Sequence, residues 1–165
     1  MLFKGMSNKK TFIIVLIFAL FLSCNKSVVW GPEQEVGKYI YPFELKTIDG
    51  ETVSSSTLKG KEAVIVFFNT WCPDCHEVLP VIQEWMEEDM NGTTYLCIAR
   101  GQTNDEIIPF WEENGFAMKA AADPGKEIYN LFTGGKPYGV PLIYMVDKRG
   151  LVWNRILQNE KLSRF

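Results

Sequence analysis

Histidine and cysteine are scarce in this chain of 165 residues, which has one histidine, His76, and four cysteines. A structural zinc site takes four cysteine or histidine ligands, usually in two spaced pairs. Here only Cys72 and Cys75 form such a pair, and His76 follows directly. A single histidine also argues against Ser-His-Asp and Cys-His hydrolases, in which histidine is the base. We therefore predict no metal site.

The sequence also lacks a basic patch and a long apolar run. Lys and Arg number 17 against 20 Asp and Glu, and they are scattered, so we predict no nucleic-acid partner. The longest apolar run near the start, Thr11–Leu22, would span about 18 Å as a helix, short of a bilayer core of about 30 Å. The length leaves room for one domain.

The first residues are typical of a secretory signal. Lys4, Lys9 and Lys10 precede the apolar run, and "FLSC" ends at Cys24. This ending resembles the lipobox of bacterial lipoproteins, although Phe21 stands where the usual leucine would be. The resemblance implies cleavage before Cys24 and a lipid on its thiol. An ordinary signal peptide that happens to end in a cysteine is the alternative.

These features divide the chain into a signal peptide (1–23), a tether (24–37) and one domain (38–165). Cleavage would leave 14 basic and 20 acidic residues, a formal charge of −6. We accordingly expect an exported bacterial cell-envelope lipoprotein that faces the periplasm, with the membrane leaflet left open.

The stretch "FFNTWCPDCHEVLP" places Cys72 and Cys75 two residues apart behind an apolar run. With zinc disfavoured, two roles remain for the pair. A structural disulfide would close too small a loop to stabilise much. Thiol–disulfide exchange is therefore favoured. Cys97 lies in the apolar stretch "TTYLCIA", where we expect a buried strand thiol.

Hydrophobic periodicity predicts an α/β domain. The apolar run 61–69 predicts a central strand, and Pro73 suits the first turn of the helix that follows it. The alternation around Asp49-Gly50 predicts a hairpin. The expected order is a hairpin (43–53), strand (61–69), helix (73–89), strand (93–100), helix (104–114), short helix (126–132) and two antiparallel strands (141–147 and 151–156). We expect a mixed sheet with helices on both faces.

This order places the cysteine pair where a strand passes into a helix. A helix N-terminus carries unpaired N–H groups and partial positive charge, which favour a thiolate at Cys72. Cys75 lies about one turn further on the same side and can close the ring after a mixed disulfide has formed. We therefore predict that Cys72 attacks and Cys75 resolves.

Several motifs together resemble the thioredoxin superfamily, and in particular its secreted TlpA-like branch of thiol–disulfide oxidoreductases. The resemblance covers roughly residues 37–157. It rests on "NTWCPDC", "GVP" at Gly139–Pro141, "LIYMVDKRG", the hairpin Phe43–Gly50, "LKGK" at Leu58–Lys61 and "DPGKEIYNLF" at Asp123–Phe132.

The resemblance implies a thioredoxin-like mixed sheet flanked by helices, with an added N-terminal hairpin. It further implies that Pro141 is cis opposite the cysteine pair and that the backbone of Val140 pairs with an extended substrate. Trp71 would form an apolar rim, and Pro73, between the cysteines, would support the site. The redox-active Cys72–Cys75 disulfide would then serve without a cofactor.

Two departures from the family pattern stand out. Members often place a carboxylate beneath the cysteines, six residues before the first or three after the second; those positions hold Val66 and Val78. Glu77 is rotated by about 100° and should face solvent. We therefore expect a slower or more pH-dependent resolving step. The end of the chain, Ile156–Phe165, is too short for the family's full final helix, so one sheet face should be less covered.

Three charged neighbours are expected to tune the pair. Asp74 opposes a thiolate on Cys72, protonated His76 favours it, and Glu77 could accept a proton through water. Because strong cationic support is missing, and because of the resemblance, we predict a protein-disulfide reductase. Its substrates would be disulfides of exported proteins, including those of cytochrome c maturation, and a membrane thiol relay would supply electrons.

Three alternatives remain open. A thiol peroxidase of the peroxiredoxin-related branch would carry proline and threonine seven and three residues before its cysteine, where this chain has Ile65 and Asn69. A copper-binding chaperone would also use soft thiolates, but the related copper proteins have a CxxxC spacing and a distant histidine. A non-enzymatic lipoprotein that uses the fold as a binding module is the third.

Overall fold

The computed structural model describes residues 30–158, 160 and 162. The predicted signal peptide, Cys24 and residues 25–29 of the predicted tether lie outside this part. Within it, seven strands and three helices follow one another in the order β1, β2, β3, α2, β4, α3, β5, α4, β6, β7.

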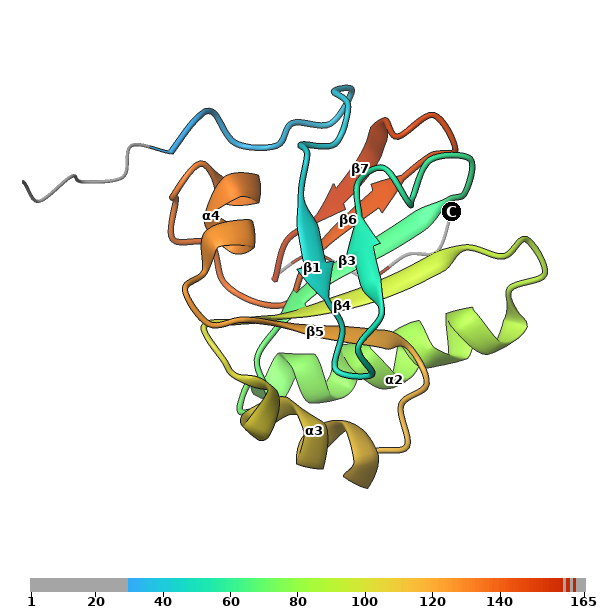
Figure 1. Cartoon of the computed structure of the whole chain (residues 1–165), viewed down its shortest axis with the longest axis vertical. Coiled ribbons are helices and arrows are strands. Elements are labelled where there is room, and N and C mark those ends of the chain that lie inside the picture. Colours follow the sequence, from blue (N-terminus) through green and yellow to red (C-terminus); the bar gives the residue numbers. More distant parts are fainter. Residues whose placement is uncertain (1–29, 159, 161, 163–165) are drawn as a thin grey trace, which may run out of the picture.

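A five-stranded mixed sheet forms the centre of the molecule (Figure 1). Its order is β5-β4-β3-β6-β7; β3, β4 and β5 are parallel, while β6 and β7 run antiparallel to their neighbours. All six residues of β3 are buried, as expected of an apolar strand with neighbours on both sides. The strands are β3 (Ala63–Phe68), β4 (Thr94–Arg100), β5 (Lys119–Asp123), β6 (Leu142–Val146) and β7 (Val152–Ile156).

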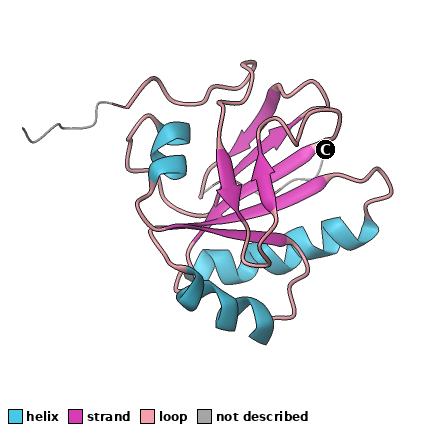
Figure 2. Cartoon of the chain, viewed as in Figure 1, coloured by secondary structure: helices cyan, strands magenta, loops and turns pink. Residues whose placement is uncertain are grey.

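Helices cover both faces of this sheet (Figure 2). The helices are α2 (Pro73–Glu88), α3 (Asn104–Glu113) and α4 (Glu127–Thr133). Successive strand residues point to opposite faces. The ring of Phe68 accordingly stacks on Phe110 of α3, whereas Phe67 contacts Tyr129 and Phe132 of α4. The apolar run that forms β3 therefore anchors both helical layers.

The predicted hairpin is present as β1 (Glu44–Lys46) and β2 (Thr52–Ser54), a separate two-stranded antiparallel sheet. Its turn reaches the edge of the main sheet, where Ile48 N–H donates to Ala120 O at 2.8 Å. At its start, the ring of Phe43 packs edge-on against Phe132. The hairpin thus lies on the same side of the sheet as α4.

Residues 30–37, the last part of the predicted tether, lie against the domain. The side chain of Gln34 is fully buried, and its backbone N–H donates to Phe132 O at 2.7 Å. Its amide oxygen accepts from the Tyr41 N–H at 2.8 Å. The carboxylate of Glu33 contacts Lys136 and Arg155. These contacts join the N-terminal segment to α4 and β7.

The predicted fold class is confirmed: a mixed sheet with helices on both faces and an added hairpin. One element was missing from the prediction, the edge strand β5, whose sequence is Lys-Ala-Ala-Ala-Asp. Alanine has low strand propensity and no branched side chain, so this stretch shows neither alternation nor β-branched enrichment. Its strand conformation depends on pairing with β4, from Leu96↔Lys119 to Arg100↔Asp123.

The end of the described chain contains a turn after β7. Leu157 and Glu160 exchange two hydrogen bonds, and none of residues 157, 158, 160 and 162 belongs to a helix. In the part of the chain that the structure describes, no helix is both long and apolar enough to span a membrane.

Candidate active site

The passage from β3 to α2 places Cys72 at the start of the helix. Cys72 is the N-cap residue with extended backbone (φ −86°, ψ 116°), and Pro73 occupies the first turn. The carbonyl of Cys72 accepts hydrogen bonds from the N–H groups of Cys75 (3.1 Å) and His76 (3.2 Å). The sulfur therefore lies at the positive end of the helix macrodipole, as predicted from the sequence.

Tertiary structure brings the loop before β6 against this sulfur. The Cys72 thiol donates to the carbonyl of Val140 at 3.2 Å, across 68 residues of sequence. The Val140–Pro141 peptide bond is cis, as the resemblance implied. Val140 and Pro141 are buried, and only 4% of Cys72 is exposed. The Cys72 sulfur thus faces the backbone carbonyl of a buried residue.

Cys75 lies one turn into α2 and is completely buried. Burial is the main cause that raises the pKa of the Cys75 thiol, and its hydrogen bond with Cys72 raises it further. Cys72 and Cys75 are both free thiols in this structure. The two thiols therefore lie at the start of α2 and one turn behind it, and their attacking and resolving roles stay predictions.

No carboxylate occupies either of the two positions where the family often has one. Val66 is fully buried in β3, and Val78 is half-buried on α2. Glu77 is exposed, as predicted. The apolar surroundings agree with the expectation that the Cys75 proton lacks a close acceptor.

The other predicted site residues surround the pair. Trp71 is 67% exposed, which suits an apolar rim, and Pro73 is exposed. His76 is exposed, and its Nε2–H donates to the Thr70 carbonyl at 2.6 Å. Asp74 accepts a hydrogen bond from Gln158 Nε2 at 2.7 Å. Their roles in tuning the pair stay predictions.

A buried polar cluster beneath the loop 69–72 was missed by sequence reasoning. Asn69 donates to the Arg100 carbonyl at 2.6 Å and to Gln102 Oε1 at 3.1 Å. Gln102 in turn accepts from the Thr70 N–H at 2.9 Å and donates to the Thr70 hydroxyl at 2.8 Å. Asn69 and Gln102 are 1% and 3% exposed. They hold the loop that presents Cys72 against the end of β4.

The sequence contained a signal for only one member of this cluster. Asn69 is an amide directly after an apolar strand, which is unusual for a buried position. Gln102 has no local signal, because its partners lie more than 30 residues away.

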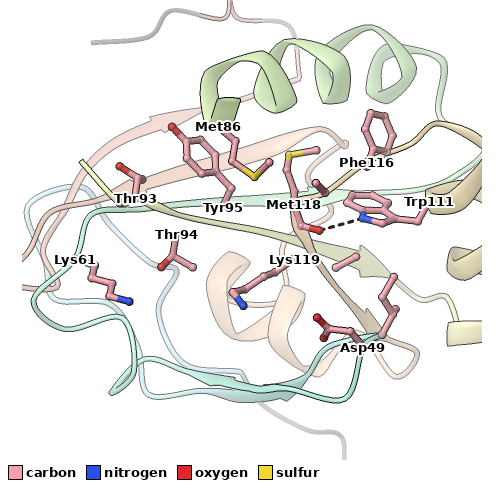
Figure 3. Close-up of a pocket in the computed structure, with 14 residues that line it drawn as sticks. Asp49, Lys61, Met86, Thr93, Thr94, Tyr95, Trp111, Phe116, Met118 and Lys119 are labelled. Atoms are coloured by element: carbon pink, nitrogen blue, oxygen red, sulfur yellow. Dashed lines mark hydrogen bonds between the residues drawn. The ribbon is translucent and has the colours of Figure 1, made fainter. Parts of the chain in front are cut away.

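Cys97 is a fully buried thiol on β4, as predicted, and burial raises its pKa. A hollow of about 470 Å³ lies at the end of the sheet away from the cysteine pair. Figure 3 shows the residues that line it. Thr94 at its rim pairs with Ala63, the first residue of β3, whereas Cys72 follows the last. Of the two lysines that line the hollow, Lys61 and Lys119, Lys119 is paired with Glu51. The hollow is therefore separate from the candidate active site.

Within residues 30–158, 160 and 162, no three His, Cys, Asp or Glu side chains are grouped as metal ligands would be.

Two curated relatives cover most of the chain. The thiol-disulfide oxidoreductase ResA of Bacillus thuringiensis is 24% identical over 156 residues, which are 91% of this chain and 88% of the relative. The thiol:disulfide interchange protein DsbE of Pseudomonas aeruginosa is 26% identical over 150 residues, 88% of this chain and 79% of the relative.

Solved structures show the same fold. A secreted disulfide oxidoreductase of Mycobacterium tuberculosis superposes with a TM-score of 0.63 at 19% identity, covering 74% of this chain and 87% of the other. StoA of Bacillus subtilis gives a TM-score of 0.60 at 20% identity, with 71% and 87% covered.

These relatives confirm the predicted thioredoxin superfamily and its TlpA-like branch. The AhpC/TSA family model matches residues 36–155, and the chain belongs to this family.

Proposed function

We propose that this protein is an extracytoplasmic protein-disulfide reductase that acts on exported proteins through Cys72 and Cys75. The observation that carries the proposal is the position of Cys72: at the N-terminus of α2, with its thiol 3.2 Å from the Val140 carbonyl. The buried Cys75 lies one turn behind. The relatives ResA and DsbE, named for thiol–disulfide chemistry, support the reaction class.

The reaction runs in two exchanges. The Cys72 thiolate attacks one sulfur of the substrate disulfide, so an S–S bond to Cys72 forms while the substrate's second sulfur leaves as a thiolate. The Cys75 thiolate then attacks the sulfur of Cys72 and releases the substrate's first sulfur. Two electrons have moved to the substrate, which ends as a dithiol, and the protein ends with a Cys72–Cys75 disulfide.

The backbone beside Cys72 and Cys75 would position the substrate. Val140 precedes the cis Pro141 and would pair with an extended substrate segment, while Trp71 would cover it as an exposed apolar rim. Pro73 fixes the first turn of the helix behind the nucleophile. We propose that no cofactor takes part, since both exchanges use sulfur alone.

Re-reduction requires an electron donor outside the cytoplasm. We propose a membrane thiol relay as the donor and a lipid on Cys24 as the means of holding the protein near it. Donor and substrate would both approach the pair at the carboxyl end of β3, beside the exposed side chain of Trp71.

A thiol peroxidase is the alternative within the AhpC/TSA family. The positions of its expected proline and threonine hold Ile65, buried within β3, and Asn69, whose amide bonds to Arg100 and Gln102. Neither side chain offers the hydroxyl that the threonine would bring. This environment supports disulfide exchange over peroxide reduction.

Trapping tests the proposed roles. A Cys75→Ala variant should hold substrate proteins as mixed disulfides on Cys72, whereas Cys72→Ala should hold none; a Cys97→Ala variant serves as the control because its thiol is buried. Capture by Cys75 in the Cys72→Ala variant would reverse the roles. A reduction potential near that of strong oxidants, about −120 mV, would contradict the reductase direction. Cys72-dependent turnover of peroxide would favour the peroxidase.

A further inference from the structure

The side chain of Gln158 connects two segments that flank the attacking cysteine. Its Nε2 donates to Asp74 Oδ2 at 2.7 Å, across 84 residues of sequence. Its Oε1 lies only 1.7 Å from the position that a Cβ on Gly139 would occupy. The amide group therefore fills the space in front of Gly139 that a side chain there would need.

Both contacts lie next to the reacting sulfur. Asp74 stands between the two cysteines, and Gly139 directly precedes Val140, which accepts the Cys72 thiol hydrogen bond. Gln158 thus joins the start of α2 to the loop before Pro141, on either side of the Cys72–Val140 contact. Cys72 is 4% exposed.

Two hydrogen bonds fix the backbone next to Gln158, whereas the side-chain amide of Gln158 is bound only weakly. Leu157 N–H donates to Glu160 Oε2 at 2.7 Å, and Glu160 N–H donates to Leu157 O at 2.9 Å. Among the described residues the amide has one hydrogen bond, to the partly exposed carboxylate of Asp74, and such a bond contributes little net free energy. A substrate can therefore displace the amide without unfolding the turn.

Asp74 would form a stronger hydrogen bond if a basic substrate side chain replaced the amide of Gln158. Its hydrogen-bond donor is a neutral amide, and none of the ion pairs among the described residues includes it. The nearby cationic candidate, His76, is engaged with the Thr70 carbonyl. Hydrogen bonds from Lys or Arg to a carboxylate are stronger than those from a neutral amide.

We propose that Gln158 is a latch beside Cys72, bridging Asp74 and Gly139, and that substrates with Lys or Arg beside the reacting cysteine open it by replacing the amide on Asp74. This inference rests on the proposed function and adds a substrate class: disulfide segments with a basic residue next to the cysteine.

Alkylation of Cys72 tests the latch without using the enzymatic activity. In a Cys75→Ala background, Gln158→Ala should raise the rate of Cys72 alkylation by iodoacetamide about three-fold, the effect of one partly exposed hydrogen bond. Gln83→Ala is the matched control, since Gln83 lies on α2 and bonds to Glu87 and Ala117 instead. Equal rates for Gln158→Ala and Gln83→Ala would overturn the latch.

A second variant displaces the same amide from the opposite side. Gly139→Ala places a methyl group where Gln158 Oε1 lies, so the flexible side chain must move. Its effect on alkylation should not add to that of Gln158→Ala, because residues in contact couple. Additive effects would show that the two residues act independently and would contradict the latch.

Peptide selectivity tests the substrate class. Two disulfide peptides that differ by Lys or Glu beside the cysteine should differ about ten-fold in kcat/KM, mainly through KM, because a charge pair is either formed or opposed. Asp74→Asn should remove most of this preference, while the charge-matched control Glu84→Gln, an exposed residue of α2, should keep it. Equal kcat/KM for both peptides in the wild type would refute the basic substrate class.

Failure of the proposed function gives a different result. If the wild type reduced neither peptide, the reductase proposal would fall, yet the alkylation rates would still decide whether Gln158 covers Cys72. If the peptides were reduced and the alkylation rates were equal, the latch alone would fall.

Discussion

A carboxylate introduced at position 78 should accelerate the resolving step. Burial raises the pKa of the Cys75 thiol above the ordinary value of about 8.5, so at pH 7 less than about 3% of it is thiolate. The wild-type rate of resolution should therefore rise about ten-fold per pH unit from pH 6 to 8. Without a base nearby, the proton must pass to solvent.

The structure indicates where a base can be placed. Val78 lies three residues after Cys75 on α2, with Cβ atoms on neighbouring turns about 5–6 Å apart. Because Val78 is half-buried, Glu at this position should cost about 1–2 kcal/mol of stability. Val66 is fully buried in β3, where an unpaired carboxylate would cost several kcal/mol. Val78→Glu is thus the practical substitution.

The expected gain is about 10²-fold in the resolving rate at pH 7, the lower range for general-base catalysis. Reduced protein would be mixed with a disulfide peptide in a stopped-flow instrument and followed by the fluorescence of the exposed Trp71, with acid quenching to quantify the mixed disulfide. The pH dependence should flatten in Val78→Glu.

The matched control is Val81→Glu, the same substitution at another half-buried position of α2, one turn further from Cys75. Equal acceleration by Val81→Glu would refute the base at position 78. A wild-type resolving rate that does not change between pH 6 and 8 would refute the elevated pKa of Cys75.

Three further predictions concern stability. The reduced protein should lose stability relative to the oxidised protein as the pH rises above about 8.5, because the unfolded chain then releases the Cys75 proton while the folded protein, with its raised pKa, keeps it. Urea titrations of both forms at pH 7 and 9.5 check this prediction, and equal losses of stability in the two forms would contradict it. Gln34→Ala should lower the free energy of unfolding by about 2 kcal/mol, since it empties a fully buried position and leaves the partly buried N–H of Tyr41 without its acceptor. An unchanged urea midpoint would show that residues 30–37 do not belong to the domain. Hydrogen bonds from Tyr138 and Lys136 lower the pKa of Glu33, so the carboxylate's contribution to stability should be present above about pH 4.3 and be lost as the pH falls through the lowered pKa. Glu33→Gln should cost about 1 kcal/mol at pH 7 and less at lower pH in thermal melts, and a cost that does not change with pH would refute the carboxylate's role.

Local sequence patterns were sufficient for most of the helices and strands. The uninterrupted apolar run of β3, the periodic apolar residues of α2 and the Asp49-Gly50 turn each specify backbone conformation within a few residues. The spacing of Cys72 and Cys75 and the absence of a second pair of ligands can also be read directly from the sequence, and they favoured thiol–disulfide exchange over a zinc site. Strand β5 was missed because its three alanines carry no such pattern, and only the pairing with β4 makes it a strand.

The relation between distant segments was decided by tertiary structure. From the sequence alone, Cys72 and Cys75 were predicted to be the reacting pair. The family resemblance added that Val66 and Val78 stand at the two positions where relatives often have a carboxylate. The thiol contact with Val140 was expected only through the family resemblance, since it joins residues 68 apart.

The Asn69–Gln102 cluster and the bridge from Gln158 to Asp74 had no complete signal in the sequence. Both consist of polar side chains whose partners lie 31 to 84 residues away. Backbone preference acts between neighbours in the chain, so the sequence by itself determined the elements other than β5 and predicted Cys72 as the nucleophile. Packing the sheet brought together the ends of β3, β4 and β7 with the loop before β6, and only that packing determined which residues surround Cys72.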